Sequence, residues 1–149
     1  GKFKVKISII NGPNLNLLGK RKPEVYGCET LIDIEKWINN QSIAKKHFIS
    51  WFQSNHEGEI IEKIHSLIDA VDGLIINPGA LTHYSYAVRD AIEAIGLPTV
   101  EVHLSDIYSR EKFRKLSVLK DVCTTQIYGK GKEGYLNALE ILVNTENAS

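Results

Sequence analysis

Short runs rich in Val and Ile alternate along this chain with longer segments whose apolar residues recur at helical spacing. The first run covers residues 4–10, and further strands are expected at residues 47–52, 73–76, 99–102 and 122–127. Helical stripes fill the intervals, the clearest at residues 60–71 and the last at residues 135–143. Strands that alternate with helices predict a parallel sheet joined by right-handed crossovers.

Five such units predict a single-domain α/β fold of the flavodoxin-like type. This fold is a five-stranded parallel sheet with helices on both faces and the strand order 2-1-3-4-5. The 149 residues are enough for one domain with a sizeable core, and no linker or repeat divides them. Residues 145–149 are expected to form a frayed tail.

Local signals mark the ends of three helices. Thr30 with Asp33 resembles a capping box at the start of the first helix. Ser54 and Glu57 suit the start of the second. Gly96, followed by a proline, is expected to end the helix that precedes it.

Charge and cysteine usage exclude several classes of protein. Eighteen Lys and Arg residues balance eighteen Asp and Glu residues, which argues against a nucleic-acid-binding surface. Cys28 and Cys123 match no metal or redox spacing and are expected to be free thiols in a reducing compartment. The longest apolar runs are too short for a bilayer, and no signal peptide is visible. We therefore expect a cytoplasmic protein without membrane contact.

Polar segments follow the expected strands at residues 11–14, 53–58, 77–83, 101–105 and 129–134. Ligands of open parallel sheets bind beyond the carboxyl ends of the strands, where these segments should meet. Four of the five are dense in Asn, His, Ser and Gly, residues that turns and helix caps also favour. One such loop is explained by turn chemistry alone, but four at one edge favour a binding site.

Three other motifs have weaker readings. Residues 129–134, GKGKEG, match a dinucleotide fingerprint, but too little chain follows for a second strand and a ribose-binding acid, so a tight turn is favoured. The five histidines show no metal-ligand spacing, and no metal is expected. Residues 19–27 follow the first strand and are bounded by glycines, so this loop could close as a lid.

The chain resembles the type II 3-dehydroquinases over nearly its whole length. The resemblance rests on NGPNLNLLGKRKPEVYG (residues 11–27), FQSNHEGEII (52–61), INPGALTHYSYAVRDA (76–91) and EVHLSDIYSREKFR (101–114). It implies an enzyme of the shikimate pathway that dehydrates 3-dehydroquinate to 3-dehydroshikimate. The implied reaction is an anti-elimination through an enolate with no cofactor, and the implied assembly is a homododecamer of trimers.

The resemblance also assigns roles to residues. Tyr26 corresponds to the catalytic base, and Arg21 to the residue that favours its ionised form. Asn14 matches the residue that orders a water near the enolate oxygen. His103 matches the general acid, and Glu101 would orient its imidazole. The matching substrate-binding positions are Asn77, His83, Asp90, Leu104, Ser105 and Arg114, with backbone amides at Leu104 and Ser105 and a carboxylate partner in Arg114.

Two positions depart from the family's usual pattern. Asp106 stands where Asn is usual, and Thr125 stands where Gly is usual near the fifth strand. A flavodoxin-like binding protein or electron carrier is the main alternative, because a fold alone does not give a function. The first loop argues against it, since NGPNLNLLG is not a Thr- or Ser-rich phosphate-binding loop.

Overall fold

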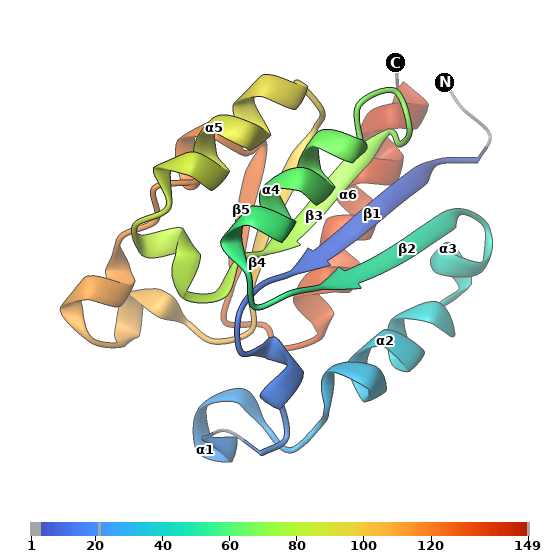
Figure 1. Cartoon of the computed structure of the whole chain (residues 1–149). Helices are drawn as coiled ribbons and strands as arrows, with labels where there is room; N and C mark the ends of the chain where they lie inside the picture. The colour runs from blue at the N-terminus through green and yellow to red at the C-terminus, as the bar shows by residue number, and fades with distance from the viewer. Residues whose placement is uncertain (1–3, 21, 149) are drawn as a thin grey trace.

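The computed structural model describes residues 4–20 and 22–148, and of residues 25 and 26 it describes the backbone only. All five strands are parallel, in the order β2-β1-β3-β4-β5, which confirms the predicted sheet (Figure 1). Their bounds are β1 (Lys6–Asn11), β2 (Phe48–Gln53), β3 (Gly73–Asn77), β4 (Thr99–His103) and β5 (Thr125–Tyr128).

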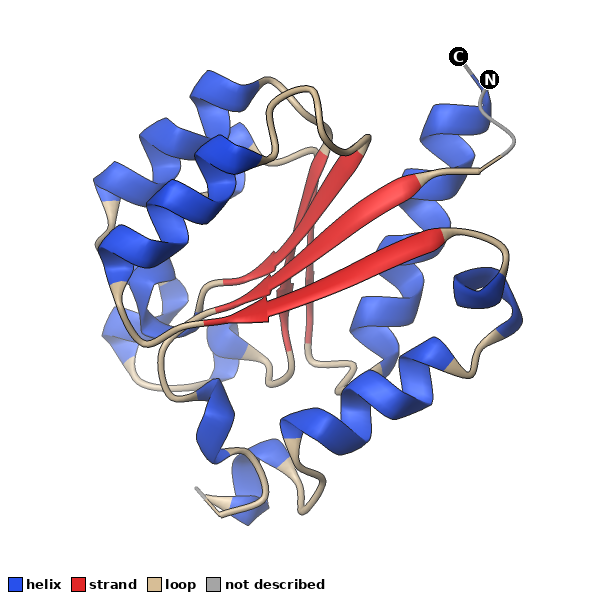
Figure 2. Ribbon diagram, turned by 45° about the vertical axis from the view of Figure 1, so that its right-hand side comes forward, coloured by secondary structure: helices blue, strands red, loops and turns tan. Residues whose placement is uncertain are grey.

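Helices cover both faces of the sheet (Figure 2). One face carries α2 (Leu31–Asn39), α3 (Ser42–Lys45) and α6 (Glu133–Ala148). The other carries α4 (Glu57–Ser66) and α5 (Tyr86–Ile95), which pack side by side. This arrangement explains why β3 is buried at every position.

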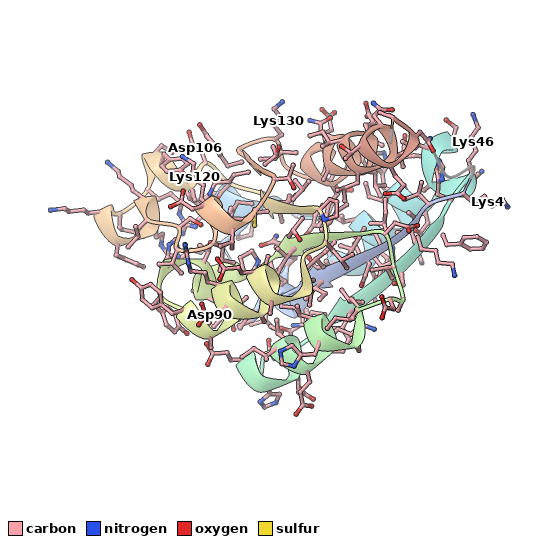
Figure 3. The ribbon with its side chains drawn as sticks, turned by 90° about the horizontal axis from the view of Figure 1, so that it is seen from above. Lys4, Lys46, Asp90, Asp106, Lys120 and Lys130 are labelled. Carbon is pink, nitrogen blue, oxygen red and sulfur yellow. The ribbon has the colours of Figure 1, made fainter. Side chains whose placement is uncertain are left out.

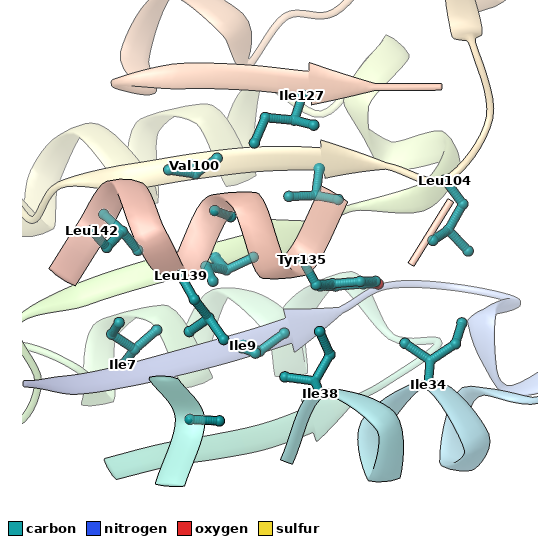
Figure 4. Packing of buried hydrophobic residues seen from close by; sticks show 14 of the residues in the cluster. Ile7, Ile9, Ile34, Ile38, Val100, Leu104, Ile127, Tyr135, Leu139 and Leu142 are labelled. Carbon is teal, nitrogen blue, oxygen red and sulfur yellow. The ribbon is translucent and has the colours of Figure 1, made fainter. Parts of the chain in front are cut away.

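Alternation along the strands divides the core into two layers. Ile7 and Ile9 of β1 pack with Tyr135 and Leu139 of α6 (Figure 4), whereas Ile10 packs with the α4 and α5 side. The same period governs β4, where Val100 and Val102 face α6. The alternate residues of β4 therefore face the opposite layer. They are polar and buried: Thr99, Glu101 and His103.

The strand register aligns polar residues at the carboxyl edge of the sheet. Asn11 at the end of β1 is in register with Gln53 of β2 and Asn77 of β3. Short helices lie in the connections at this end: η1 (Leu15–Leu17), α1 (Pro23–Tyr26), η2 (Gly79–His83), η3 (Ile107–Ser109), η4 (Lys112–Lys115) and η5 (Lys120–Val122). The fold thus places the candidate segments on one rim.

Several predicted boundaries need correction. α6 begins at Glu133 and continues to Ala148, so residues 145–148 are helical rather than a loose tail. β5 begins at Thr125 and not at residue 122, because η5 occupies residues 120–122. The apolar stripe expected at residues 60–71 outlasts α4, which ends at Ser66 and passes into turns.

The helix-start signals had mixed outcomes. The capping box of Thr30 and Asp33 is confirmed, with both reciprocal hydrogen bonds present. At α4 the N-cap is His56, and Ser54 acts one step earlier by accepting a hydrogen bond from the His56 amide at 2.9 Å. Gly96 ends α5 with φ +65°, as predicted.

Within residues 4–20 and 22–148, no helix has the length and apolar character needed to cross a bilayer.

Candidate active site

A cleft of about 510 Å³, partly open to solvent, lies at the carboxyl ends of the central strands. Seven of the eleven predicted site residues line it: Asn14, Asn77, His83, His103, Leu104, Ser105 and Arg114. The other lining residues are Pro13, Leu15, Gly79, Ala80, Ile107 and Arg110. The rim predicted from the strand-end rule is therefore a real concavity.

Two glycines allow the loops after β1 and β3 to interlock beneath the cleft. The Gly12 amide donates to the Asn77 carbonyl at 2.8 Å. A Cβ on Gly12 would lie 2.5 Å from the Pro78 carbonyl oxygen, and one on Gly79 would lie 2.9 Å from that of Pro13. Gly79 also has φ +59°. Only glycine fits this approach, which sequence reasoning did not identify.

Asn14 reaches the cleft from a left-handed backbone conformation. Its φ is +70°, a value that Asn tolerates better than most residues. Its amide donates to Asn55 Oδ1 at 2.9 Å, and Gln53 Nε2 donates to the Gly12 carbonyl at 3.1 Å. The loop after β2 thus fixes the loop that carries Asn14.

A buried hydrogen-bonded group ties β1, β3 and α6 together below the cleft. Tyr135 donates its hydroxyl proton to Asn11 Oδ1 and accepts from Asn77 Nδ2 at 3.1 Å. Asn77 Oδ1 accepts from the Gly79 amide at 3.3 Å. Burial raises the pKa of Tyr135 far above its ordinary range, so its hydroxyl stays neutral. One of the two amide protons of Asn77 is used in its bond to Tyr135, and Asn77 also lines the cleft.

His103 and Glu101 form a buried pair at the end of β4. His103 Nε2 lies 2.5 Å from Glu101 Oε2, and the two residues are 5% and 0% exposed. Thr82 Oγ1 donates to the same oxygen at 2.5 Å, and Ser117 Oγ donates to the carboxylate at 2.8 Å. Burial raises the pKa of Glu101, but the hydrogen bonds from His103, Thr82 and Ser117 outweigh it and hold the pKa below its ordinary value.

The charge on Glu101 fixes the tautomer of His103. A carboxylate only accepts, so Nε2 carries a proton and Nδ1 is the second nitrogen. When Nδ1 is also protonated, the imidazolium is stabilised by the carboxylate behind it. The pair can therefore hold a proton in the cleft wall and release it.

His83 is oriented by the chain segment that follows η4. Its Nδ1 lies 2.7 Å from the Leu116 carbonyl, which can only accept, so Nδ1 carries the proton. Burial lowers the pKa of His83, and the bond to Leu116 only partly offsets this. A neutral His83 leaves Nε2 as an acceptor.

Arg114 supplies positive charge to the cleft. It pairs with Glu111, and its guanidinium lies 4.6 Å from the centre of the Phe113 ring.

Leu104 and Ser105 are held by the glycine-rich turn, since their carbonyls accept from the amides of Gly131 and Gly129, each at 3.0 Å. Residues 129–132 of the GKGKEG motif form the predicted turn, and Glu133 and Gly134 begin α6.

The remaining four predicted residues are Glu101, Asp90, Tyr26 and Arg21. Glu101 lies behind His103 in the wall. Asp90 is exposed on α5 (Figure 3) and lies outside the cleft of its own chain. Tyr26 ends α1, but its side chain lies outside the described residues, as does Arg21 altogether.

The two departures from the family pattern occupy ordinary positions. Asp106 caps η3, with Oδ1 accepting from the Tyr108 amide at 3.0 Å. Thr125 begins β5 in regular register with Val100 of β4.

Sequence reasoning missed the hydroxyl partners of Glu101. Thr82 lies inside the quoted INPGALTH motif, so its proximity to the rim could have been noticed. Ser117 lies in a segment with no periodic signal, and only the tertiary fold brings it to β4. Among the described residues, no group of three or more His, Cys, Asp or Glu side chains is placed to hold a metal ion.

Comparisons with known proteins agree with this geometry. Residues 5–143 match the family described as dehydroquinase class II. The chain is 55% identical over 139 residues to the 3-dehydroquinate dehydratase of Halothermothrix orenii, covering 93% of this chain and 94% of that protein. It is 50% identical over 138 residues to the enzyme of the same name from Bacillus subtilis, covering 93% of each. The crystal structure of type II dehydroquinase from Butyrivibrio crossotus superposes with a TM-score of 0.90 at 45% identity, covering 93% of this chain and 97% of that one.

Proposed function

The chain belongs to the type II dehydroquinase family, and from that premise we propose that it dehydrates 3-dehydroquinate to 3-dehydroshikimate. The observation that carries the proposal is the buried His103–Glu101 pair, which opens onto a cleft that Arg114 also lines. A proton donor and a cation in one cleft suit the removal of a hydroxyl group from an anionic substrate.

In the proposed reaction Tyr26 is the base. Its tyrosinate removes a proton from the carbon beside the substrate ketone, and the electron pair moves onto the ketone oxygen as an enolate. A free tyrosine has a pKa of about 10, so ionisation near pH 7 requires a depression of roughly 3 units, or about 4 kcal/mol. The permanent charge of Arg21 would supply much of this stabilisation.

The enolate is stabilised where its charge develops. A water ordered by Asn14 donates to the enolate oxygen. The enolate then collapses, the carbon–oxygen bond to the leaving hydroxyl breaks, and the His103 imidazolium protonates that hydroxyl so that it departs as water. Glu101 keeps the imidazole oriented through its hydrogen bond to Nε2. No step involves a metal, a nucleotide or a lysine imine.

Substrate binding is assigned to the remaining cleft residues. Arg114 pairs with the substrate carboxylate and exchanges its Glu111 partner for it. The amides of Leu104 and Ser105 donate to the same group, and Asn77 and His83 bond the ring hydroxyls. Asp90 is assigned to binding as well, but from a neighbouring copy, because it lies outside its own cleft.

Assembly as a homododecamer of trimers would supply that neighbour. Four large apolar side chains near the cleft residues His83 and Arg114 in the sequence are at least 57% exposed in the single chain: Tyr84, Tyr86, Phe113 and Leu116. We refer to them as the aromatic surface. Burial of such a patch is a common reason for self-association, and we propose that trimer formation covers it.

An absorbance assay tests the proposed reaction. The product is a conjugated enone, so ultraviolet absorbance should grow when the purified protein meets 3-dehydroquinate. The His103→Ala protein, which keeps the cleft but lacks the acid, is the matched control and should be nearly silent. A parent protein that produces no enone would contradict the proposed function.

A further inference from the structure

Glu101 has more hydrogen-bond donors than a residue that only orients a histidine requires. Besides His103, two hydroxyl groups reach its carboxylate, Thr82 Oγ1 from η2 and Ser117 Oγ from the segment after η4. The two hydroxyl oxygens lie 2.9 Å apart. The carboxylate is completely buried, so these bonds are not exchanged for water.

The surrounding backbone determines where the hydroxyl protons point. Ser117 Oγ accepts from the amides of Leu119 at 3.2 Å and Lys120 at 3.1 Å, which occupies both of its lone pairs. It therefore cannot accept from Thr82, whose proton must go to Glu101. The hydroxyl proton of Ser117 is likewise left to donate, and Glu101 lies 2.8 Å away.

We infer that Thr82 and Ser117 are positioning residues that make His103 a better acid by weakening Glu101 as a base. This inference rests on the proposed function. Each hydroxyl that donates to a carboxylate spreads its charge and lowers its affinity for a proton. With both hydroxyls in place, Glu101 holds the imidazolium in position but pulls less strongly on its proton, so His103 releases that proton to the leaving hydroxyl more readily.

The other ionisable groups around the pair are few. His83 faces it from η2, and burial favours the neutral form of that ring by lowering its pKa. Cys123 faces Glu101 from the chain between η5 and β5, and burial raises its pKa to about 12, so it is neutral at pH 7. Arg114 and Arg110 line the same cleft and are always charged. In the part of the chain that the structure describes, the hydrogen bonds to the Glu101 carboxylate come from His103, Thr82 and Ser117.

Ser117 also connects the acid to the binding residue Arg114. The chain from Arg114 to Val118 runs along η2, where the Val118 amide donates to the Thr82 carbonyl at 2.7 Å. The Leu116 carbonyl accepts from His83. A substrate carboxylate held by Arg114 would therefore order the segment that presents Ser117 to Glu101. Thr82 is joined to this segment through its backbone carbonyl, which a change of side chain keeps, so the two hydroxyls should differ in their effect on substrate binding.

The test compares Thr82→Val and Ser117→Ala with the parent across a pH series. In both variants Glu101 should hold the imidazolium proton more tightly, so the alkaline limb of kcat/KM should move to higher pH. At pH 7 kcat should fall about tenfold, which corresponds to about 1.4 kcal/mol of the barrier. KM should change little in Thr82→Val and rise in Ser117→Ala. Thr82→Ser keeps the hydroxyl and should restore the parent profile.

Thr99→Val is the matched control. Thr99 lies on the same strand as Glu101, is completely buried, and donates to the Leu97 carbonyl at 3.0 Å. Its loss should lower stability in the same way but leave the alkaline limb in place. NMR titration of His103 gives a readout independent of turnover, and its midpoint should rise in both hydroxyl variants.

The inference would be overturned if Ser117→Ala shifted neither the alkaline limb of kcat/KM nor the titration midpoint of His103. This holds even if Thr82→Val fails to fold. So would a shift of equal size in Thr99→Val. The parent protein in the same assay separates this failure from that of the proposed function: an active parent with unshifted variants rejects only the role of the hydroxyls.

Discussion

Tyr26 and Arg21 carry the most demanding step of the proposed reaction, because a phenol must act as a base near neutral pH. Tyr26→Phe keeps the ring but removes the ionisable oxygen, so turnover should nearly disappear while substrate binding persists. Arg21→Ala should cause a similar loss at pH 7, since the phenol then returns toward a pKa of about 10. Part of that loss should be recovered at high pH, where the phenol ionises unaided, and Tyr26→Phe should show no recovery.

Steady-state rates between pH 6 and pH 10 check this contrast. Retention of turnover within about tenfold of the parent by Tyr26→Phe, a barrier change of only about 1.4 kcal/mol, would exclude Tyr26 as the base.

Glu101 links the acid site to the stability of the fold. The folded pKa of Glu101 lies below its ordinary value of 4.5, so it contributes stability that is fully present above pH 4.5 and is lost as pH falls through the folded pKa. The substitution Glu101→Gln replaces one carboxylate oxygen by an amide NH2 group, which is itself a donor and cannot accept hydrogen bonds from His103, Thr82 or Ser117. At pH 7 the variant should lose about 3 kcal/mol, as expected for removal of one partner of a buried pair.

Thermal midpoints at pH 7 and at pH 3.5 test this sign. The parent should lose more stability on acidification than the variant, so the gap between them should narrow. A gap that widens at low pH would show that Glu101 is not the ionised partner.

At the scale of elements, the site depends on how the loops after β1 and β3 interlock. Gly12→Ala places a Cβ 2.5 Å from a backbone oxygen that cannot rotate away. The loops must separate, and we expect a loss of about 2 kcal/mol together with a higher KM. Gly58→Ala is the matched control: it lies in α4 with nothing within 4 Å of a new Cβ, and should gain about 0.4–1 kcal/mol. Equal melting temperatures for the two variants would refute this account.

Sequence periodicity predicted which helices and strands form, but not the residues at which they begin and end. Alternating strands and helices predict the sheet order because crossover handedness leaves few choices. The start of β5 was misplaced since Val122 looks like strand sequence while η5 holds it in a turn. The end of α6 was misplaced because the polar residues after Val143 give no apolar stripe, although backbone hydrogen bonds continue the helix to Ala148.

The candidate site was predictable where it lies directly after a strand. Asn77 and His103 end β3 and β4, so the strand-end rule places them at the rim. Ser117 could not be found this way, because its contact with Glu101 depends on the path of the chain after η4. The need for glycine at position 12 also arises from a distant backbone, that of Pro78, which no local pattern reveals.

At the scale of the whole molecule, the position of Asp90 bears on how the chains assemble. Asp90 is assigned to substrate binding, yet it is exposed on α5 and is not among the residues that line the cleft. Exposure of the aromatic surface to water in the single chain is unfavourable. If trimers bury that surface, α5 of one copy can approach the cleft of the next, and each site would then combine His103 from one chain with Asp90 from another.

Mixed oligomers distinguish this arrangement from one in which each chain acts alone. His103→Ala and Asp90→Asn should each be nearly inactive as homo-oligomers. When the two are co-expressed with different tags and purified through both, a site that takes His103 from the Asp90→Asn chain can take an intact Asp90 from the His103→Ala chain. Random mixing should then restore about one quarter of the parent's sites. Recovered enone formation would be accompanied by an oligomeric mass in light scattering. If Asp90 acted within its own chain, every site would keep one of the two substitutions and the mixture would stay inactive. That result would show that Asp90 does not contribute to a neighbouring site, and the assembly would lose its main functional reason.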